Sequence, residues 1–202
     1  MKVAAQIGLF DSDARVIVDD PSGRIVYYPS ALEAGQAAGL FASLLETVPW
    51  RSERRMMYDR EVDVPRLVAS LPIDGELPPA VAAVVPLIER LSDARFTSIG
   101  FNLYRDGRDS VAPHNDRLPE LVAGVPIALL SLGATRRMTI RSKAQPRRVL
   151  DLDLDSGSLL VMSYETQYHY DHGIPKTDAQ VGPRISAAFR MRSKATQREM
   201  KA

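Results

Sequence analysis

The chain has 202 residues, of which 45% are hydrophobic, which is enough for one well-packed domain. It contains no Cys, which excludes disulfide bridges, thiolate zinc sites and cysteine nucleophiles, so a metal would have to bind through His, Asp or Glu. No stretch approaches the roughly 20 apolar residues of a membrane span, and we expect a soluble cytoplasmic protein with no membrane partner. The net charge of +1 neither demands nor forbids a polyanionic partner.

The N-terminal part begins with a predicted strand and helix. Residues 24–28 (RIVYY) are rich in β-branched and aromatic side chains and predict a short strand. Ser30 and Glu33 have the spacing of a capping box, and apolar residues recur at helical spacing after them. A helix is therefore predicted from Ser30 to Pro49, and Trp50 follows it directly.

The middle of the chain is less regular, and the C-terminal half is rich in predicted strands. Residues 51–66 show neither a helical nor a strand period and predict a hairpin or loop. Residues 78–95 have apolar side chains at helical spacing, with Pro86 predicting a kink or a split. Six strands are predicted at 97–104, 126–132, 137–141, 147–154, 158–163 and 184–191. Such a series fits a sandwich or barrel, including a double-sheet jelly roll that places metal ligands in its mouth.

Three residues of this half are candidate metal ligands. His114 and Asp116 are two apart, so on a strand or at its exit both side chains point to the same side. Alone, such a triplet is more often a surface turn, but His172, one of only three His, follows another predicted strand. Two imidazoles and one carboxylate on one face of iron leave positions for a bidentate oxo-acid and dioxygen. His169, between two Tyr, is better explained as a packed or supporting residue.

Arg184 and Arg190 form a candidate anion site. The segment between them alternates as a strand does, so both guanidinium groups can face the same interior. A dicarboxylate would give them bidentate partners. The competing interpretation is a salt bridge to Asp or Glu on a neighbouring strand.

Taken together, these motifs resemble the AlkB family of iron(II) and 2-oxoglutarate-dependent dioxygenases, in order and in spacing. The resemblance covers about residues 23–192. The motifs are Asn102-Leu-Tyr-Arg-Asp-Gly107, His114-x-Asp116, Pro126-Ile127, Ser131-Leu-Gly133, Gly157 to Met162, His172-Gly-Ile-Pro175 and Arg184 to Arg190. The resemblance implies an α+β fold with a double-stranded β-helix (jelly-roll) core and N-terminal helices packed on one sheet. It also implies one domain over residues 1–202, with a lid-bearing N-terminal extension (1–95) and a catalytic core (96–192).

The same resemblance assigns roles to individual residues. His114, Asp116 and His172 match the iron ligands. Arg184 matches the Arg that binds the distal carboxylate of 2-oxoglutarate, and Arg190 the one near its metal-proximal end. Asn102 and Tyr104 match polar residues that complete the hydrogen bonds of this cosubstrate, although without the family they could simply form a polar strand face. The implied reaction uses Fe(II), 2-oxoglutarate and O2 to oxidise an N-linked alkyl carbon, with release of an aldehyde, succinate and CO2.

Local charge makes nucleic acid a candidate substrate. Six basic residues and no acid lie between Ala134 and Leu150, where related repair dioxygenases bind the phosphate backbone: Arg136, Arg137, Arg141, Lys143, Arg147 and Arg148. Trp50, Met56, Met57 and Tyr58 lie where relatives cover a flipped base, which offers a stacking platform. The simpler interpretations are a solvated basic face and, for Trp50, a core anchor.

Two departures from the family bear on the substrate. After Asp116, where repair members often have an acidic pair, only Glu120 could accept from an exocyclic amine. Between His172 and Arg184 there is one Lys, where duplex-acting relatives are richly basic, and this favours single-stranded DNA or RNA. We expect a monomer.

Two other function classes stay open at this point. One is an AlkB-type oxygenase acting on a protein side chain, a lipid or a small molecule. The other is a non-catalytic binding module that keeps the fold, which the intact metal and arginine motifs disfavour.

Overall fold

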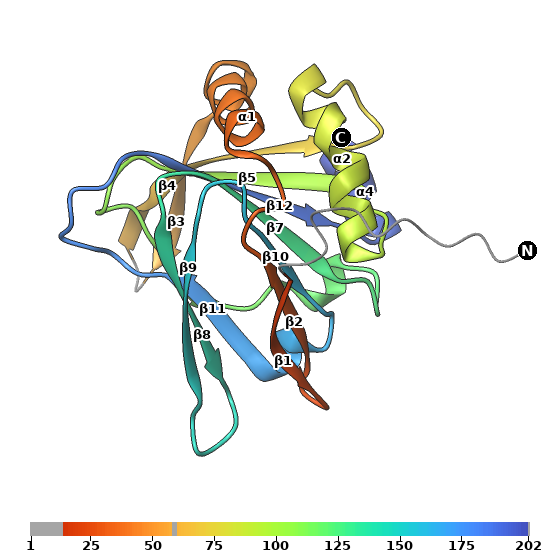
Figure 1. Cartoon of the computed structure of the whole chain (residues 1–202), viewed down its shortest axis with the longest axis vertical. Helices are drawn as coiled ribbons and strands as arrows, with labels where there is room; N and C mark the ends of the chain where they lie inside the picture. The colour runs from red at the N-terminus through yellow and green to blue at the C-terminus, as the bar shows by residue number, and fades with distance from the viewer. Residues whose placement is uncertain (1–13, 58–59, 202) are drawn as a thin grey trace, which may run out of the picture.

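Two antiparallel sheets and a few helices make up the protein. The computed structural model describes residues 14–57 and 60–201, with the backbone alone for 55–57, 60–63 and 198–201. The large sheet has the strand order β1-β2-β10-β7-β12-β5-β4-β3, and the small sheet has the order β6-β11-β8-β9. This arrangement is consistent with a jelly-roll core (Figure 1).

The large sheet takes strands from both halves of the chain. Its strands are β1 (Arg15–Asp20), β2 (Gly23–Tyr28), β10 (Leu159–Met162), β7 (Ile127–Gly133), β12 (Arg184–Arg190), β5 (Ser98–Tyr104), β4 (Arg60–Pro72) and β3 (Arg51–Met57). The small sheet consists of β6 (Val111–His114), β11 (Tyr170–Ile174), β8 (Arg136–Ser142) and β9 (Val149–Leu154). The helices are α1 (Ala34–Thr47), α2 (Pro79–Ser92), the 3-10 turn η2 (Leu118–Glu120), α3 (Thr166–His169) and α4 (Lys194–Lys201).

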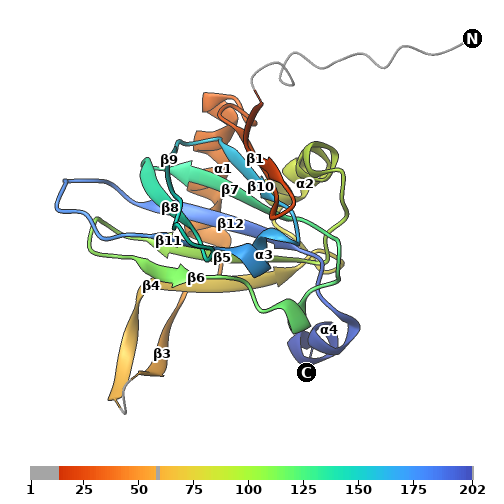
Figure 2. The same ribbon diagram turned by 90° about the horizontal axis from the view of Figure 1, so that it is seen from below.

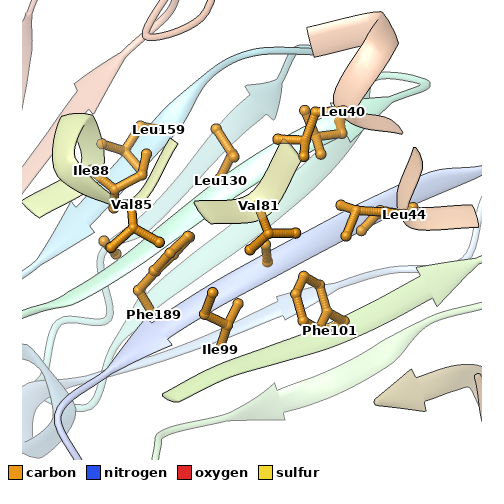
Figure 3. Close-up of a cluster of buried hydrophobic side chains, with 14 of the residues drawn as sticks. Leu40, Leu44, Val81, Val85, Ile88, Ile99, Phe101, Leu130, Leu159 and Phe189 are labelled. Carbon is orange, nitrogen blue, oxygen red and sulfur yellow. The ribbon is translucent and has the colours of Figure 1, made fainter. Parts of the chain in front are cut away.

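Strand β12 separates two differently composed interiors. It pairs with β5 on one side and β7 on the other, and its side chains alternate between the faces of the sheet. Ile185, Ala187 and Phe189 belong to the hydrophobic core that also contains buried residues of α1 and α2. Figure 3 shows Leu44 of α1 and Val81 of α2 over this face of the sheet.

The opposite face of β12 looks towards the small sheet. Ala188 belongs to a second hydrophobic cluster, which also contains Met138 and Ile140 of β8 and Tyr170 of β11. Arg184, Ser186 and Arg190 share the strand face of Ala188 because they are spaced by two. The candidate site residues of β12 therefore lie between the two sheets, away from the helices.

The six strands predicted in the C-terminal half are all present, with bounds shifted by at most two residues. Residues 51–66 form a hairpin, as one of the two expectations had it, and Figure 2 shows the β3 end of this hairpin projecting from the edge of the large sheet. Strands β1, β6 and β11 and helices α3 and α4 were not predicted as such. These elements are short or polar, so they carry a weak periodic signal.

Both predicted helices exist, with another N-cap for the first and no split at Pro86 in the second. The N-cap of α1 is Glu33, in a reciprocal capping box with Gln36, and not Ser30. The amide of Leu32 donates to the carbonyl of Gly157 at 3.0 Å, so the chain enters the core before the helix begins. Helix α2 continues through Pro86 as one element. Among the described residues, no helix has the length and apolarity to cross a membrane.

The packing of α1 on the sheet predicts a contrast between two neighbouring leucines. Leu44 is 1% exposed and Leu45 is 37% exposed. Leu44→Ala should lower the free energy of unfolding by about 2–5 kcal/mol, because it removes buried methyl groups and leaves a cavity. Leu45→Ala, the matched control, should change it by no more than about 1 kcal/mol. Urea unfolding of both variants gives the comparison, and equal losses would contradict the assignment of α1 to the core.

Candidate active site

Two histidines meet on neighbouring strands of the small sheet. His114 on β6 lies opposite His172 on β11, and their ring centroids are 4.7 Å apart. His172 is buried, and His114 is exposed at the end of its strand. The Nδ1 atom of His114 is 2.9 Å from the carbonyl oxygen of Ala112, which can only accept, so Nδ1 carries the proton. Nε2 of His114 is thus the nitrogen left for a metal.

Asp116 lies close to this pair but faces an arginine. Its carboxylate oxygens accept hydrogen bonds from Nε and Nη2 of Arg190 at 2.7 and 3.0 Å. As the side chains stand, no three His, Asp or Glu residues among those described form a group that could hold a metal ion. A metal bound by His114, Asp116 and His172 together would need the carboxylate to turn from Arg190 or to be shared with it. The ligand assignment therefore stays a prediction.

The donor set itself suits the implied metal. Two imidazoles and a carboxylate are the ligand types of non-haem Fe(II) sites. Burial alone would raise the pKa of Asp116, but the charge and hydrogen bonds of Arg190 outweigh burial and lower that pKa to about 2. The carboxylate is therefore ionised at neutral pH, as a metal ligand must be.

His169 does not join the two other histidines. It is the last residue of α3, it is exposed, and its ring centroid is 6.4 Å from that of Tyr168. The packed role expected for it is wrong, since solvent reaches the side chain.

A second part of the site surrounds Arg184. This side chain is 1% exposed, and Nη2 donates to the Ser131 hydroxyl at 2.8 Å. Its Nε and Nη1 atoms are buried without any hydrogen-bond partner among the described residues. Burial lowers the pKa of Arg184, but an arginine stays protonated in proteins. A buried cation with two unpaired N–H groups calls for an anion, and a carboxylate of 2-oxoglutarate fits this requirement.

Tyr104 lies between two guanidinium groups. The Arg184 Cζ atom is 5.2 Å and the Arg136 Cζ atom 5.7 Å from its ring centroid. Burial raises the pKa of the Tyr104 phenol, so it remains a neutral hydrogen-bonding group. Asn102, on the same face of β5, accepts a hydrogen bond from Nε of Arg66 at 2.7 Å. Both predicted polar residues thus lie on the strand face of the site, with Tyr104 against Arg184.

Arg136, Arg66 and Ser131 were not predicted for this part of the site. Ser131 lies on β7 next to β12, a pairing that the sequence does not reveal. Arg136 was grouped with the exposed basic residues, but it is 3% exposed and donates to the carbonyl oxygens of Asp106, Asp109 and Pro175. It therefore fastens the loops after β5 and β11 to β8.

The structure corrects two of the predicted substrate contacts. The Nε1 atom of Trp50 donates to the Leu44 carbonyl, and its ring packs edge-on against Phe101 in the helix-covered core. Trp50 is therefore a core anchor on the far face of the sheet. Glu120 is not a free acceptor, because its carboxylate pairs with Arg192 at 2.7 Å and Arg117 at 3.3 Å. Tyr58 and the side chain of Met56 lie outside the described residues.

The predicted basic hairpin is only partly available to a ligand. Arg137 pairs with Asp153, and Arg141 with Asp171. The Lys143 Nζ atom donates to the Asn115 amide oxygen and the Gln167 carbonyl, both at 3.0 Å. The guanidinium groups of Arg147 and Arg148 are exposed and make no hydrogen bond or ion pair within the described part of the chain. These two and Lys143, which remains exposed, are the cations left for phosphate.

The burial of His172 predicts an acid-dependent loss of stability. Burial and, after it, the neighbouring His114 lower the pKa of its imidazole from 6.5 to about 4, against the opposing effect of Asp116. Between pH 6.5 and 4 this imidazole is protonated in the unfolded chain but neutral in the folded chain. Stability therefore falls as the pH falls. From pH 7 to 4.5, His172 should account for about 2–3 kcal/mol of lost stability in the metal-free protein.

Urea unfolding of His172→Gln at the two pH values checks this. The variant should lose correspondingly less stability on acidification than the parent. The stabilisation from Asp116 is lost only below pH 3.8, outside this window. His169→Gln, at the exposed histidine, should behave as the parent does, and a parent-like response of His172→Gln would contradict a neutral, buried His172.

Comparisons with known proteins identify the family of this chain. The family model of the 2OG-Fe(II) oxygenase superfamily matches residues 24–198. The alpha-ketoglutarate-dependent dioxygenase alkB homolog 3 of Mus musculus is 32% identical, over 84% of this chain and 67% of its own. The Homo sapiens protein of the same name shows the same identity and coverage.

A second relative and a solved structure extend the comparison. The DNA oxidative demethylase ALKBH2 of Bos taurus is 35% identical over 52% of this chain and 43% of its own. The solved structure of OsALKBH1 matches with a TM-score of 0.60 and 14% identity, covering 83% of this chain and 97% of that one, which shows a shared fold. The chain therefore belongs to the 2OG-Fe(II) oxygenase superfamily and is a 2-oxoglutarate-dependent dioxygenase of the AlkB type.

Proposed function

We propose that this enzyme removes alkyl groups from the nitrogen atoms of bases in DNA or RNA by oxidation. One oxygen atom of O2 enters succinate as 2-oxoglutarate loses CO2, and the other enters the alkyl carbon, which leaves as an aldehyde. Iron(II), bound with 2-oxoglutarate, supplies the activation of dioxygen. The observation that carries the proposal is the buried, incompletely paired Arg184, which shares a face of β12 with Arg190, the residue that holds Asp116 near His172. The family and the relatives named above supply the reaction class.

The chain's own residues bind and orient the reactants. Nε and Nη1 of Arg184 leave N–H donors for a carboxylate of 2-oxoglutarate, in a region from which water is excluded. Tyr104 presents a neutral hydroxyl beside it. His114 and His172 would hold the metal, and Arg190 keeps Asp116 ionised beside them. Iron and one carboxylate of the cosubstrate would then be held by the inner faces of the two sheets.

The nucleic-acid substrate rests on two kinds of support. The similar ALKBH2 is named a DNA oxidative demethylase. In this chain, Lys143, Arg147 and Arg148 form an exposed basic surface near the end of β8. Such a surface binds the phosphate backbone without reading sequence. We further propose that the enzyme acts as a cytoplasmic monomer and prefers single strands.

Offering methylated substrates tests this function. The iron-loaded enzyme would receive 2-oxoglutarate, O2 and either a methylated single-stranded DNA, its duplex, an RNA or the free nucleoside. Mass spectrometry should show loss of the methyl group with stoichiometric formaldehyde and succinate. His172→Ala should abolish turnover, and His169→Ala, the matched control, should retain much of it. Succinate formation without any demethylated base would instead indicate an oxygenase with a protein, lipid or small-molecule substrate.

The Arg184 side chain should lower the stability of the metal-free protein and strengthen the binding of 2-oxoglutarate. Arg184→Met removes a charge whose N–H groups are unpaired, so the metal-free protein should become more stable by about 1–3 kcal/mol. The same change should weaken 2-oxoglutarate binding by about 2–5 kcal/mol, because one carboxylate loses its partner. Urea unfolding and calorimetric titration of the metal-loaded protein measure the two effects.

Arg136→Met is the matched control for this prediction. Arg136 is equally buried, but three carbonyl oxygens accept its N–H groups. Its replacement should therefore destabilise the protein. If Arg184→Met and Arg136→Met lost stability to the same extent, Arg184 would be a structural residue and not an anion-binding residue.

A further inference from the structure

An exposed aromatic surface lies next to the predicted metal ligands. Tyr168, on α3, is 54% exposed and is the only aromatic among the large hydrophobic side chains that are exposed within the described residues. Its ring centroid lies 5.8 Å from that of Tyr164, edge to face, and 6.4 Å from that of His169. We call Tyr164, Tyr168 and His169 the α3 shelf. Tyr168 and His169 are exposed and Tyr164 is half-buried, so the shelf presents aromatic ring surface to a partner.

The α3 shelf is held rigidly beside the active site. Thr166 and Gln167 of the same helix are buried, and the Gln167 amide oxygen accepts from the Asp116 backbone N–H at 2.9 Å. Lys143 bridges the Gln167 carbonyl and the side chain of Asn115, the residue between His114 and Asp116. Figure 2 shows α3 on the side of the molecule where β6 ends. The shelf and the His114–Asp116 segment therefore form one hydrogen-bonded unit.

The charge around the α3 shelf suits a polyanion. The Lys143 backbone N–H donates to the carbonyl of His169 at 2.8 Å, which places the start of the β8–β9 turn directly against the shelf. Arg147 and Arg148 follow in the same turn, with their guanidinium groups exposed. Asp171, the acid nearest to the shelf on β11, already pairs with Arg141. Glu165, the N-cap residue of α3, is the other acid of residues 164–171, and the three exposed cations outnumber it.

We propose that the α3 shelf stacks an unpaired base of single-stranded nucleic acid, next to the base being processed, while Lys143, Arg147 and Arg148 hold the adjoining phosphates. The inference rests on the proposed function and adds to it a stacking surface that gives the preference for single strands a physical cause. A ring can stack on a base only where a base face is free, and in a duplex the neighbouring base pairs cover both faces. The shelf therefore discriminates in favour of single strands.

Replacing Tyr168 tests the inference. Fluorescence anisotropy would measure the affinity of the metal- and 2-oxoglutarate-loaded enzyme, without O2, for a labelled single-stranded oligonucleotide and for its duplex. Tyr168→Ala should weaken single-strand binding about tenfold and leave duplex binding unchanged. Tyr168→Phe keeps the ring and should bind as the parent does. Leu45→Ala, at another exposed hydrophobic residue on the helix-covered side of the sheet, is the matched control. Thermal melting of each variant confirms that it is folded.

The outcomes separate this inference from the proposed function. Demethylation of a free methylated nucleoside needs no neighbouring base, so Tyr168→Ala should retain it at the parent rate. If Tyr168→Ala binds single strands as tightly as the parent, or weakens duplex binding equally, the α3 shelf is not a stacking site, whatever the enzyme does to methylated bases. A parent enzyme that binds and demethylates no nucleic acid would overturn the proposed function and the shelf together.

Discussion

The alternation of strand β12 is the constraint on which the rest of the structure depends. Successive side chains of a strand point to opposite faces, so the same seven residues serve two interiors. Ile185, Ala187 and Phe189 fix the strand in the helix-covered core, which sets its register against β5 and β7. That register in turn puts Arg184 beside Tyr104 and Ser131. A slip by one residue would exchange the two faces, placing cations in the hydrophobic core.

The fold accepts an unfavourable group at this point. Arg184 is buried with two unpaired N–H groups, a situation that native proteins mostly avoid. Arg136 and Arg190 show the usual solution, since carbonyl oxygens surround the first and the carboxylate of Asp116 faces the second. The contrast among these three arginines is more informative than the burial of any one of them. It distinguishes a residue that supports the loops, one that holds a carboxylate, and one that lacks its anion.

The sequence predicted the strands of the catalytic half well, because long β-branched runs between turn signals are the strongest local pattern. It predicted poorly which cations are exposed. Arg136 alternates with Met138 and Ile140 on the same face of β8, so its burial could have been inferred. The packing of Trp50 against Phe101 and the Asp116–Arg190 pair depend on contacts between distant segments, 74 residues apart in the second case. Periodicity carries no information on such contacts, so the chemistry of the site was easier to predict than its geometry.

The pairing of most of the basic residues changes how substrate recognition has to work. If only Lys143, Arg147 and Arg148 contact phosphates, the log-log salt slope for a single strand is about −2, since each contact contributes roughly −0.7. Electrostatic attraction of that size steers a polyanion to the surface but holds it weakly at physiological salt. Stacking, at about 1–3 kcal/mol per base, is then comparable with the whole charge contribution. Recognition on this surface therefore depends on free base faces as much as on phosphate charge, and this favours single strands without any contact that reads sequence.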